Sequence, residues 1–118
     1  EKSSTHRDVA IAEASLRQGR AFLYEAIEAA WSAAQAGAVP DELKRDVRLA
    51  TTSAVDAGKK AVDIVYEQAG GTAVYRTSPL QRRFRDVHVA TQHMMVKQQT
   101  YELAGRLFLK QPTDTSQL

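Results

Sequence analysis

The chain contains three long stretches in which apolar residues recur every three or four positions, the spacing that places them on one face of a helix. These stretches cover residues 9–34, 43–65 and 80–108. No segment of the sequence alternates apolar and polar residues as a half-buried β-strand does. We therefore predict an all-α chain that folds as an up-and-down bundle of three long helices.

Two breaks rich in glycine and proline separate the three stretches. Gly37 ends the first stretch, and Pro40 with two acidic residues after it starts the second. Gly70-Gly71 ends the second, because glycine adopts the left-handed dihedrals of a helix C-terminus at little cost, and Ser78-Pro79 starts the third. We expect helices over residues 6–36, 41–69 and 79–110.

Two further local signals refine these helices. Thr5 and Asp8 have the spacing of a capping box, which predicts the start of the first helix. The polar run Thr91-Gln92-His93 interrupts the apolar pattern of the third helix. We therefore expect a kink or break near Gln92–Met94.

Composition excludes several classes of protein. A single domain of 118 residues buries roughly two-thirds of its unfolded surface, so it needs no disulfide or metal to fold. The chain has no cysteine, which fits a reducing cytoplasm, and its net charge of +2 is too small for a nucleic-acid surface. It has no apolar run near the roughly 20 residues of a membrane span. Because the sequence opens on Glu1 rather than Met, we expect a fragment of a larger protein.

The start of the third helix carries far more hydrogen-bonding groups than packing requires, and this excess marks it as the candidate site. The groups are those of Arg82, Arg83, Arg85, Asp86, His88, Thr91, Gln92 and His93. His88 and His93 are five positions apart and do not share a helical face, so we expect no metal site. Asp86 is expected to pair with Arg82, Arg83 or the second helix.

Three motifs in this region resemble the C-terminal helical domain of the acyl-CoA dehydrogenase superfamily. They are Ala69-Gly70-Gly71-Thr72-Ala73, Ser78-Pro79-Leu80-Gln81-Arg82 and Arg85-Asp86-Val87-His88-Val89-Ala90-Thr91-Gln92-His93. More narrowly, they resemble the type-2 branch, which contains monooxygenases that use reduced flavin. The likeness extends along nearly all of the chain, although only residues 70–93 are specific. It implies a four-helix bundle that lacks its first helix, which lies upstream of Glu1 in such proteins.

The resemblance implies a flavin-dependent monooxygenase or hydroxylase that oxygenates an aromatic or similar organic substrate with reduced flavin and O₂. Two alternatives stay open at this point. One is the C-terminal domain of an acyl-CoA dehydrogenase, and the other is a helical oligomerisation module without a cofactor. In each case we expect the isolated fragment to be inactive.

The site residues follow from matching this sequence to the family motifs. Met94 stands where the dehydrogenases carry a catalytic glutamate, and methionine cannot act as a base. Histidine as a residue type titrates near neutral pH, so His93 is the candidate catalytic base. The candidate flavin-binding residues are Gly70, Gly71, Arg82, Arg85, Thr91 and Gln92.

The resemblance also suggests the cofactor and the partners. Glu67 stands where the dehydrogenases often have a glutamine that reaches the dinucleotide of a neighbouring subunit, and an acid there repels pyrophosphate. This favours reduced FMN, or FAD that is held loosely, over tightly bound FAD. We expect a flavin reductase as supplier of reduced flavin, and a homo-oligomer, a tetramer in the full-length enzyme. An apolar face left bare by the missing helix also favours self-association.

Overall fold

The computed structural model describes residues 2–70, 79–93, 96–116 and 118 of the chain, and Gly71 to Ser78, with Met94 and Met95, lie outside the described residues. Four helices follow one another: α1 (Lys2–Gln35), α2 (Asp41–Ala69), α3 (Pro79–Ala90) and α4 (Gln99–Phe108). No strand occurs in the described part of the chain. The predicted all-α class is therefore confirmed.

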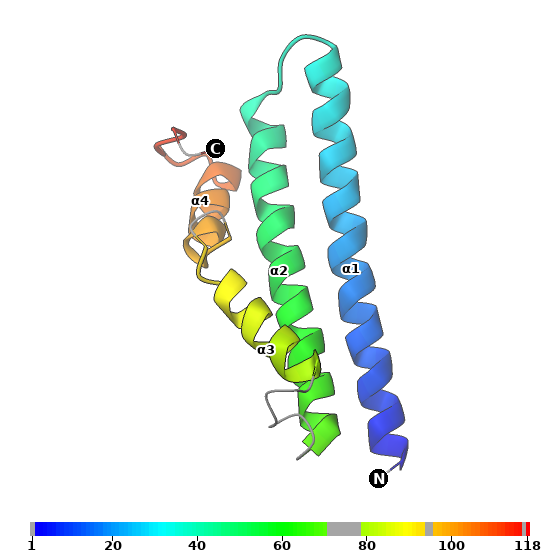
Figure 1. Cartoon of the computed structure of the whole chain (residues 1–118). Helices are drawn as coiled ribbons and strands as arrows, with labels where there is room; N and C mark the ends of the chain where they lie inside the picture. The colour runs from blue at the N-terminus through cyan, green and yellow to red at the C-terminus, as the bar shows by residue number, and fades with distance from the viewer. Residues whose placement is uncertain (1, 71–78, 94–95, 117) are drawn as a thin grey trace.

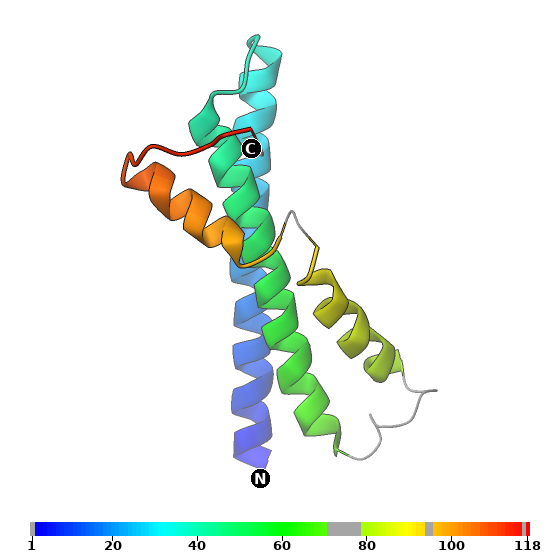
Figure 2. The same cartoon turned by 90° about the vertical axis from the view of Figure 1, so that its left-hand side faces the viewer.

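The long helix α2 lies at the centre of the molecule. It packs against α1 on one side and against α3 and α4 on the other, whereas α1 lies apart from both short helices. Figures 1 and 2 show α1 and α2 antiparallel along their length, with α3 and α4 diverging from each other on the opposite side of α2. The long axis measures 51 Å, about the length of a 34-residue helix at 1.5 Å per residue, so α1 alone sets it.

The interface between α1 and α2 is built from very small residues. Ala12, Ala26, Ala50 and Ala61 are each at most 5% exposed. At Gly19 the two backbones come so close that an added Cβ atom would lie 2.9 Å from the Cβ atom of Ala57. Small side chains thus allow this close contact between the two helices.

The start of α1 corrects the expected capping box. The helix begins at Lys2 rather than near residue 6, so Thr5 and Asp8 lie inside it. Their side chains bind Gln68 of α2 instead: the Thr5 hydroxyl donates to Oε1 over 2.9 Å, and Nε2 donates to an Asp8 carboxylate oxygen over 2.5 Å. Thr5 and Asp8 therefore bind α1 to α2 and do not cap the helix.

The third predicted helix is divided in two. A helix over residues 79–110 with a kink or break near Gln92–Met94 was expected, and the structure has the break: α3 ends at Ala90 and α4 begins at Gln99. The Thr91 hydroxyl donates to the carbonyl oxygen of His88 over 2.6 Å. Such a bond from side chain to backbone competes with the backbone hydrogen bonds that would extend the helix. The polar run also has no apolar side chains that could pack against α2 as a further helical turn.

The apolar stripe of α1 is only partly covered. Val9, Leu16 and Ile27 were predicted to face the core, yet they are 56%, 39% and 47% exposed. Tyr24 and Trp31 on the same helix are exposed as well, at 62% and 65%. Because α1 packs against α2 alone among the described helices, Val9 and Leu16 instead line an open apolar groove whose other walls come from α2 and α3.

Candidate functional site

The segment that joins α3 to α4 carries three of the predicted site residues. The backbone N–H groups of Gln92 and His93 donate to Val89 and Ala90 over 3.0 and 3.1 Å, and that of Val96 donates to the His93 carbonyl over 2.9 Å. These bonds form a succession of turns rather than a helix. The His93 side chain is exposed in this chain.

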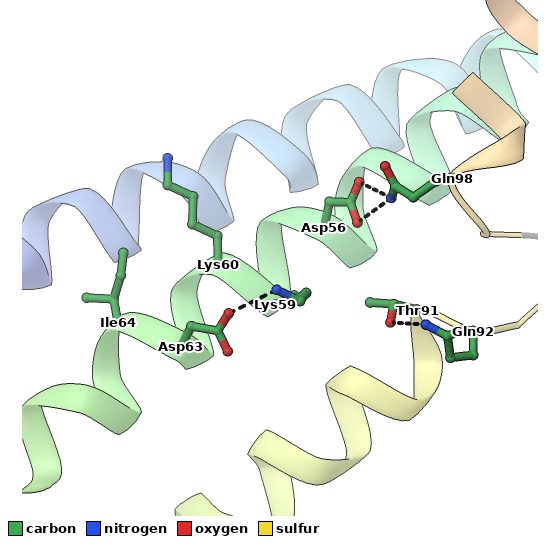
Figure 3. A pocket seen from close by; sticks show the side chains of 8 residues that line it. All are labelled: Asp56, Lys59, Lys60, Asp63, Ile64, Thr91, Gln92 and Gln98. Carbon is green, nitrogen blue, oxygen red and sulfur yellow. Dashed lines mark hydrogen bonds and ion pairs between the residues drawn. The ribbon is translucent and has the colours of Figure 1, made fainter. Parts of the chain in front are cut away.

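A polar pocket of about 620 Å³ lies between α2 and this segment. Figure 3 shows its lining side chains, which come from α2 on one side and from the segment on the other. They are Asp56, Lys59, Lys60, Asp63, Ile64, Thr91, Gln92 and Gln98. The structure thus brings Thr91 and Gln92 to the pocket wall, and His93 lies next to them in the chain without lining it.

Asp63 joins the pocket wall of α2 to α3. One carboxylate oxygen lies 2.7 Å from the His88 Nε2 atom, and the other accepts from Lys59 Nζ over 3.1 Å. Burial raises the pKa of the Asp63 carboxyl, but the hydrogen bonds from His88 and Lys59 and the charges of both outweigh it. The pKa of Asp63 therefore lies below its ordinary value, which keeps the carboxylate ionised as an acceptor.

Asp56, two turns earlier on α2, binds α4 and the residue before it. The Tyr101 hydroxyl donates to an Asp56 carboxylate oxygen over 2.7 Å, and Gln98 Nε2 donates to both oxygens over 3.1 and 3.2 Å. Burial and the neighbouring Asp56 carboxylate raise the pKa of Tyr101 to about 12. Tyr101 therefore stays a hydrogen-bond donor across the physiological range of pH.

The remaining predicted site residues lie at the other end of α3. Gly70 ends α2 with φ +61°, and its N–H group donates to the Glu67 carbonyl, as expected for a helix C-cap. Arg82 and Arg85 are exposed and form no ion pair with a described residue, and Gly71 lies outside the described residues. Along the axis of α3, Arg85 and Arg82 stand six and nine residues before Thr91, about 9 and 14 Å away.

Sequence reasoning missed the two acids of the pocket and misplaced one contact. Asp86 was expected to pair with an arginine or with the second helix, but it is exposed, and among the described residues His88 reaches α2 instead. The spacing of Asp56 and Asp63, seven residues apart, could have shown that they share one helical face. It could not have shown which helix would cover that face.

The described residues contain neither a metal-binding cluster nor a membrane-spanning helix. No group of three or more histidine, cysteine, aspartate or glutamate side chains there is placed to hold a metal ion. No helix among the described residues is both long and apolar enough to cross a lipid bilayer.

Comparisons with known proteins agree with the helical architecture. The indole-3-acetate monooxygenase of Pseudomonas putida is 42% identical over 107 residues, which are 89% of this chain and 28% of that protein. The enzyme of the same name from Acinetobacter baumannii is 30% identical over 103 residues, which are 86% of this chain and 26% of that protein. The chain therefore spans little more than a quarter of the length of these relatives.

Two solved structures share the fold. The 3-HSA hydroxylase from Rhodococcus sp. RHA1 superposes with a TM-score of 0.87 over 96% of this chain and 31% of its own, at 26% identity. The HsaA monooxygenase from M. tuberculosis superposes with a TM-score of 0.83 over 93% of this chain and 30% of its own, at 24% identity. The family model described as the acyl-CoA dehydrogenase C-terminal domain matches residues 1–98. The chain therefore belongs to the family of acyl-CoA dehydrogenase C-terminal domains, as its motifs predicted.

Proposed function

We propose that this chain is the C-terminal helical bundle of a flavin-dependent monooxygenase that oxygenates an aromatic substrate. The observation that carries the proposal is the 42% identity to an indole-3-acetate monooxygenase over 89% of the chain. Met94, at the position of the dehydrogenase glutamate, argues against α,β-dehydrogenation of an acyl-CoA. Indole-3-acetate is accordingly the first substrate to test.

The polar pocket supports the binding of a flavin at its ring. A flavin ring alternates carbonyl oxygens and N–H groups along one edge, and the wall offers matching partners in Thr91, Gln92 and Gln98. Its volume of about 620 Å³ lies within the usual range of roughly 300–1,000 Å³ for a ligand site. Bound reduced flavin would activate O₂ for transfer of one oxygen atom to the substrate.

Gly70, Gly71, Arg82 and Arg85 are proposed to serve the phosphate end of a flavin. A guanidinium group can bind a phosphate with two parallel hydrogen bonds, and both arginines are exposed. Because Arg85 and Arg82 lie about 9 and 14 Å along α3 from Thr91, the two groups would contact different parts of one cofactor or belong to two cofactor molecules. Reduced FMN, or FAD held loosely, remains the proposed cofactor.

His93 is proposed as the catalytic base. Its imidazole would accept a proton from the substrate and return it later in the cycle, a role worth roughly 100-fold or more in rate. Since the side chain is exposed in this chain, the rest of the enzyme or a second subunit must enclose it. Without such enclosure, solvent water would exchange protons with the imidazole and with the substrate.

The surface of α1 and the composition of the chain bear on its partners. The bare apolar face of α1, formed by Val9, Leu16 and Ile27, favours a homo-oligomer. A flavin reductase would supply the reduced cofactor, and the absence of cysteine fits a cytoplasmic enzyme. A light-scattering mass equal to one chain at micromolar concentration would contradict self-association.

The proposal is tested with the full-length enzyme that carries this domain. Purified protein, a flavin reductase, NADH, FMN or FAD, and indole-3-acetate are combined in air, and the oxygenated product is measured by mass spectrometry with ¹⁸O₂. We expect ¹⁸O in the product and a loss of about 100-fold in the His93→Ala variant. Reduction of an electron-transfer flavoprotein by an acyl-CoA, without oxygen insertion into any aromatic substrate, would overturn the proposal.

A further inference from the structure

One face of α2 carries polar side chains that bind α3 and α4 in turn. From its N-terminal half, Arg48 donates to the Thr100 hydroxyl of α4 over 3.1 Å, and Asp56 binds Tyr101. From its C-terminal half, Asp63 binds His88 of α3. The connection between the two short helices therefore crosses α2 between Asp56 and Asp63.

The contact of α3 with α2 is specific in geometry. The Phe84 ring lies between Tyr66 of α2 and His88, with ring centroids 4.2 and 4.3 Å apart. This stack holds the imidazole so that its Nε2 atom meets the Asp63 carboxylate at 2.7 Å. His88 in turn supplies the carbonyl that accepts the Thr91 hydroxyl. Asp63 is thus linked to the first residue after α3 through a short chain of polar contacts.

The contact of α4 is equally specific. Asp56 accepts from the Tyr101 hydroxyl and the Gln98 side chain, the third residue of α4 and the residue before its start. Asp56 and Asp63 are seven residues apart, about 10 Å along the helix axis. With the two short helices held at points this close on α2, the described residues between them, 91–93 and 96–98, form turns rather than extended chain.

We propose that Asp56 and Asp63 are positioning residues that fix the connection between α3 and α4, and with it the His93 imidazole, relative to the pocket. The proposal rests on the function proposed above for its catalytic part, although the structural part stands without it. Two carboxylates suit this task because each accepts from two donors at once, Asp63 from His88 and Lys59, and Asp56 from Tyr101 and Gln98. An asparagine presents an N–H₂ group where one of those donors now points, so it breaks one contact while keeping the shape.

Hydrogen exchange tests the structural part. Exchange of backbone amides is followed by mass spectrometry in the full-length protein for wild type, Asp63→Asn and Asp56→Asn. We expect about tenfold faster exchange at Gln92, His93 and Val96 in both variants, since their turns open when an end is released. Amides of α1 should be unchanged, which shows that the fold is kept. Asp86→Asn is the matched control, because this carboxyl is exposed on α3 and should leave all rates as they are.

A double-variant comparison tests the catalytic part. In the oxygenation assay, Asp63→Asn should lower the fraction of consumed O₂ that reaches the product about tenfold, because a displaced base transfers protons poorly. If Asp63 acts through His93, then Asp63→Asn combined with His93→Ala should equal His93→Ala alone, whereas a purely structural effect adds to it. His88→Phe keeps a ring against Phe84 but has no donor for Asp63, so it breaks the same contact from its other side and replaces Asp63→Asn if that variant does not fold.

Three results would overturn the inference. Unchanged exchange at residues 92–96 in both variants would show that the carboxylates do not hold the connection. Faster exchange with unchanged product formation would show that the connection need not be held for catalysis. Additive losses in the double variant would assign Asp63 to stability alone. If wild type forms no oxygenated product, the proposed function fails by itself, and the exchange rates still decide whether the two acids hold the connection.

Discussion

The two sides of α2 are built from different kinds of contact. Toward α1 it presents alanine and glycine, with backbones so close that Ser15 donates its hydroxyl to the Ala57 carbonyl over 3.2 Å. Toward α3 and α4 it presents charged and aromatic side chains that each meet a particular partner. The closely packed interface with α1 has no room for larger side chains. The contacts with α3 and α4 depend instead on which hydrogen-bonding groups and rings are present. The first side therefore secures the fold, and the second places individual residues.

The largest effect should come from adding volume on the α1 side. Gly19→Val places a Cβ atom 2.9 Å from the Cβ of Ala57 and 3.3 Å from the backbone of Ala54. The helices must separate, and we expect a loss of about 3 kcal/mol in the free energy of unfolding. Urea unfolding followed by circular dichroism measures it.

The matched control is Ala14→Val on the exposed side of α1, which introduces the same side chain away from α2. It should cost about 0.5 kcal/mol, the difference in helix propensity alone. Equal losses in the two variants would mean that the close approach of α1 to α2 does not limit stability.

On the other side of α2, the largest effect should come from the ring stack. Phe84→Ala removes the ring between Tyr66 and His88 and loosens α3. Because Phe84 is only half-buried, we expect about 2 kcal/mol, less than the 3–5 kcal/mol of a core phenylalanine. Urea unfolding measures the loss, and Val89→Ala, at a side chain 71% exposed, should change stability by less than about 0.5 kcal/mol. A Phe84 variant as stable as the Val89 variant would show that the stack contributes little.

The same contrast explains what the sequence could predict. Glycine and proline act locally, and so α2 spans Asp41–Ala69, the range expected from Pro40 and Gly70. Contacts on the polar side depend on how two short helices cross a third. His88 lies 25 residues from Asp63 and Tyr101 lies 45 from Asp56, and no local pattern encodes those pairings.

The burial of the apolar stripe of α1 was predicted wrongly, also because it depends on contacts between distant parts of the chain. Periodicity showed that Leu16 and Ile27 belong to one apolar face, but which part of a face is covered depends on the neighbouring elements. The family motifs around residues 70–93 singled out Thr91 and Gln92, which line the pocket, and their binding of flavin stays a prediction. They could not indicate Asp56 or Asp63, which lie outside those motifs.

The contact between Tyr101 and Asp56 should make the stability of the chain depend on pH in the alkaline range. Its pKa is raised to about 12 in the folded chain, against 10 for an ordinary tyrosine. The contribution of this contact to stability is therefore complete below pH 10 and is lost as the pH rises from 10 to 12. Absorbance at 295 nm should show one of the four tyrosines titrating near pH 12.

Tyr101→Phe is the control for this titration. It should abolish the late step and cost about 1.5 kcal/mol at neutral pH, the usual contribution of a hydrogen bond to a charged group. Asp56→Asn should move the late step part of the way toward pH 10, because burial still raises the pKa of Tyr101 while the neighbouring carboxylate no longer does. Titration of every tyrosine near pH 10 in wild type would show that the hydroxyl does not bind Asp56.

The smallest expected effect compares two neighbouring threonines of α2. Thr52 is fully buried on the polar side and its hydroxyl oxygen has no hydrogen-bond partner among the described residues, whereas the Thr51 hydroxyl donates to the Val47 carbonyl over 2.7 Å. A buried hydroxyl without a partner is unfavourable, so Thr52→Val should raise the free energy of unfolding by about 0.5 kcal/mol. Thr51→Val loses a bond and should leave stability equal or slightly lower. If Thr52→Val instead lowers the free energy of urea unfolding, the Thr52 hydroxyl has a hydrogen-bond partner. The contact between α2 and α4 then contains a polar interaction besides those of Arg48 and Asp56.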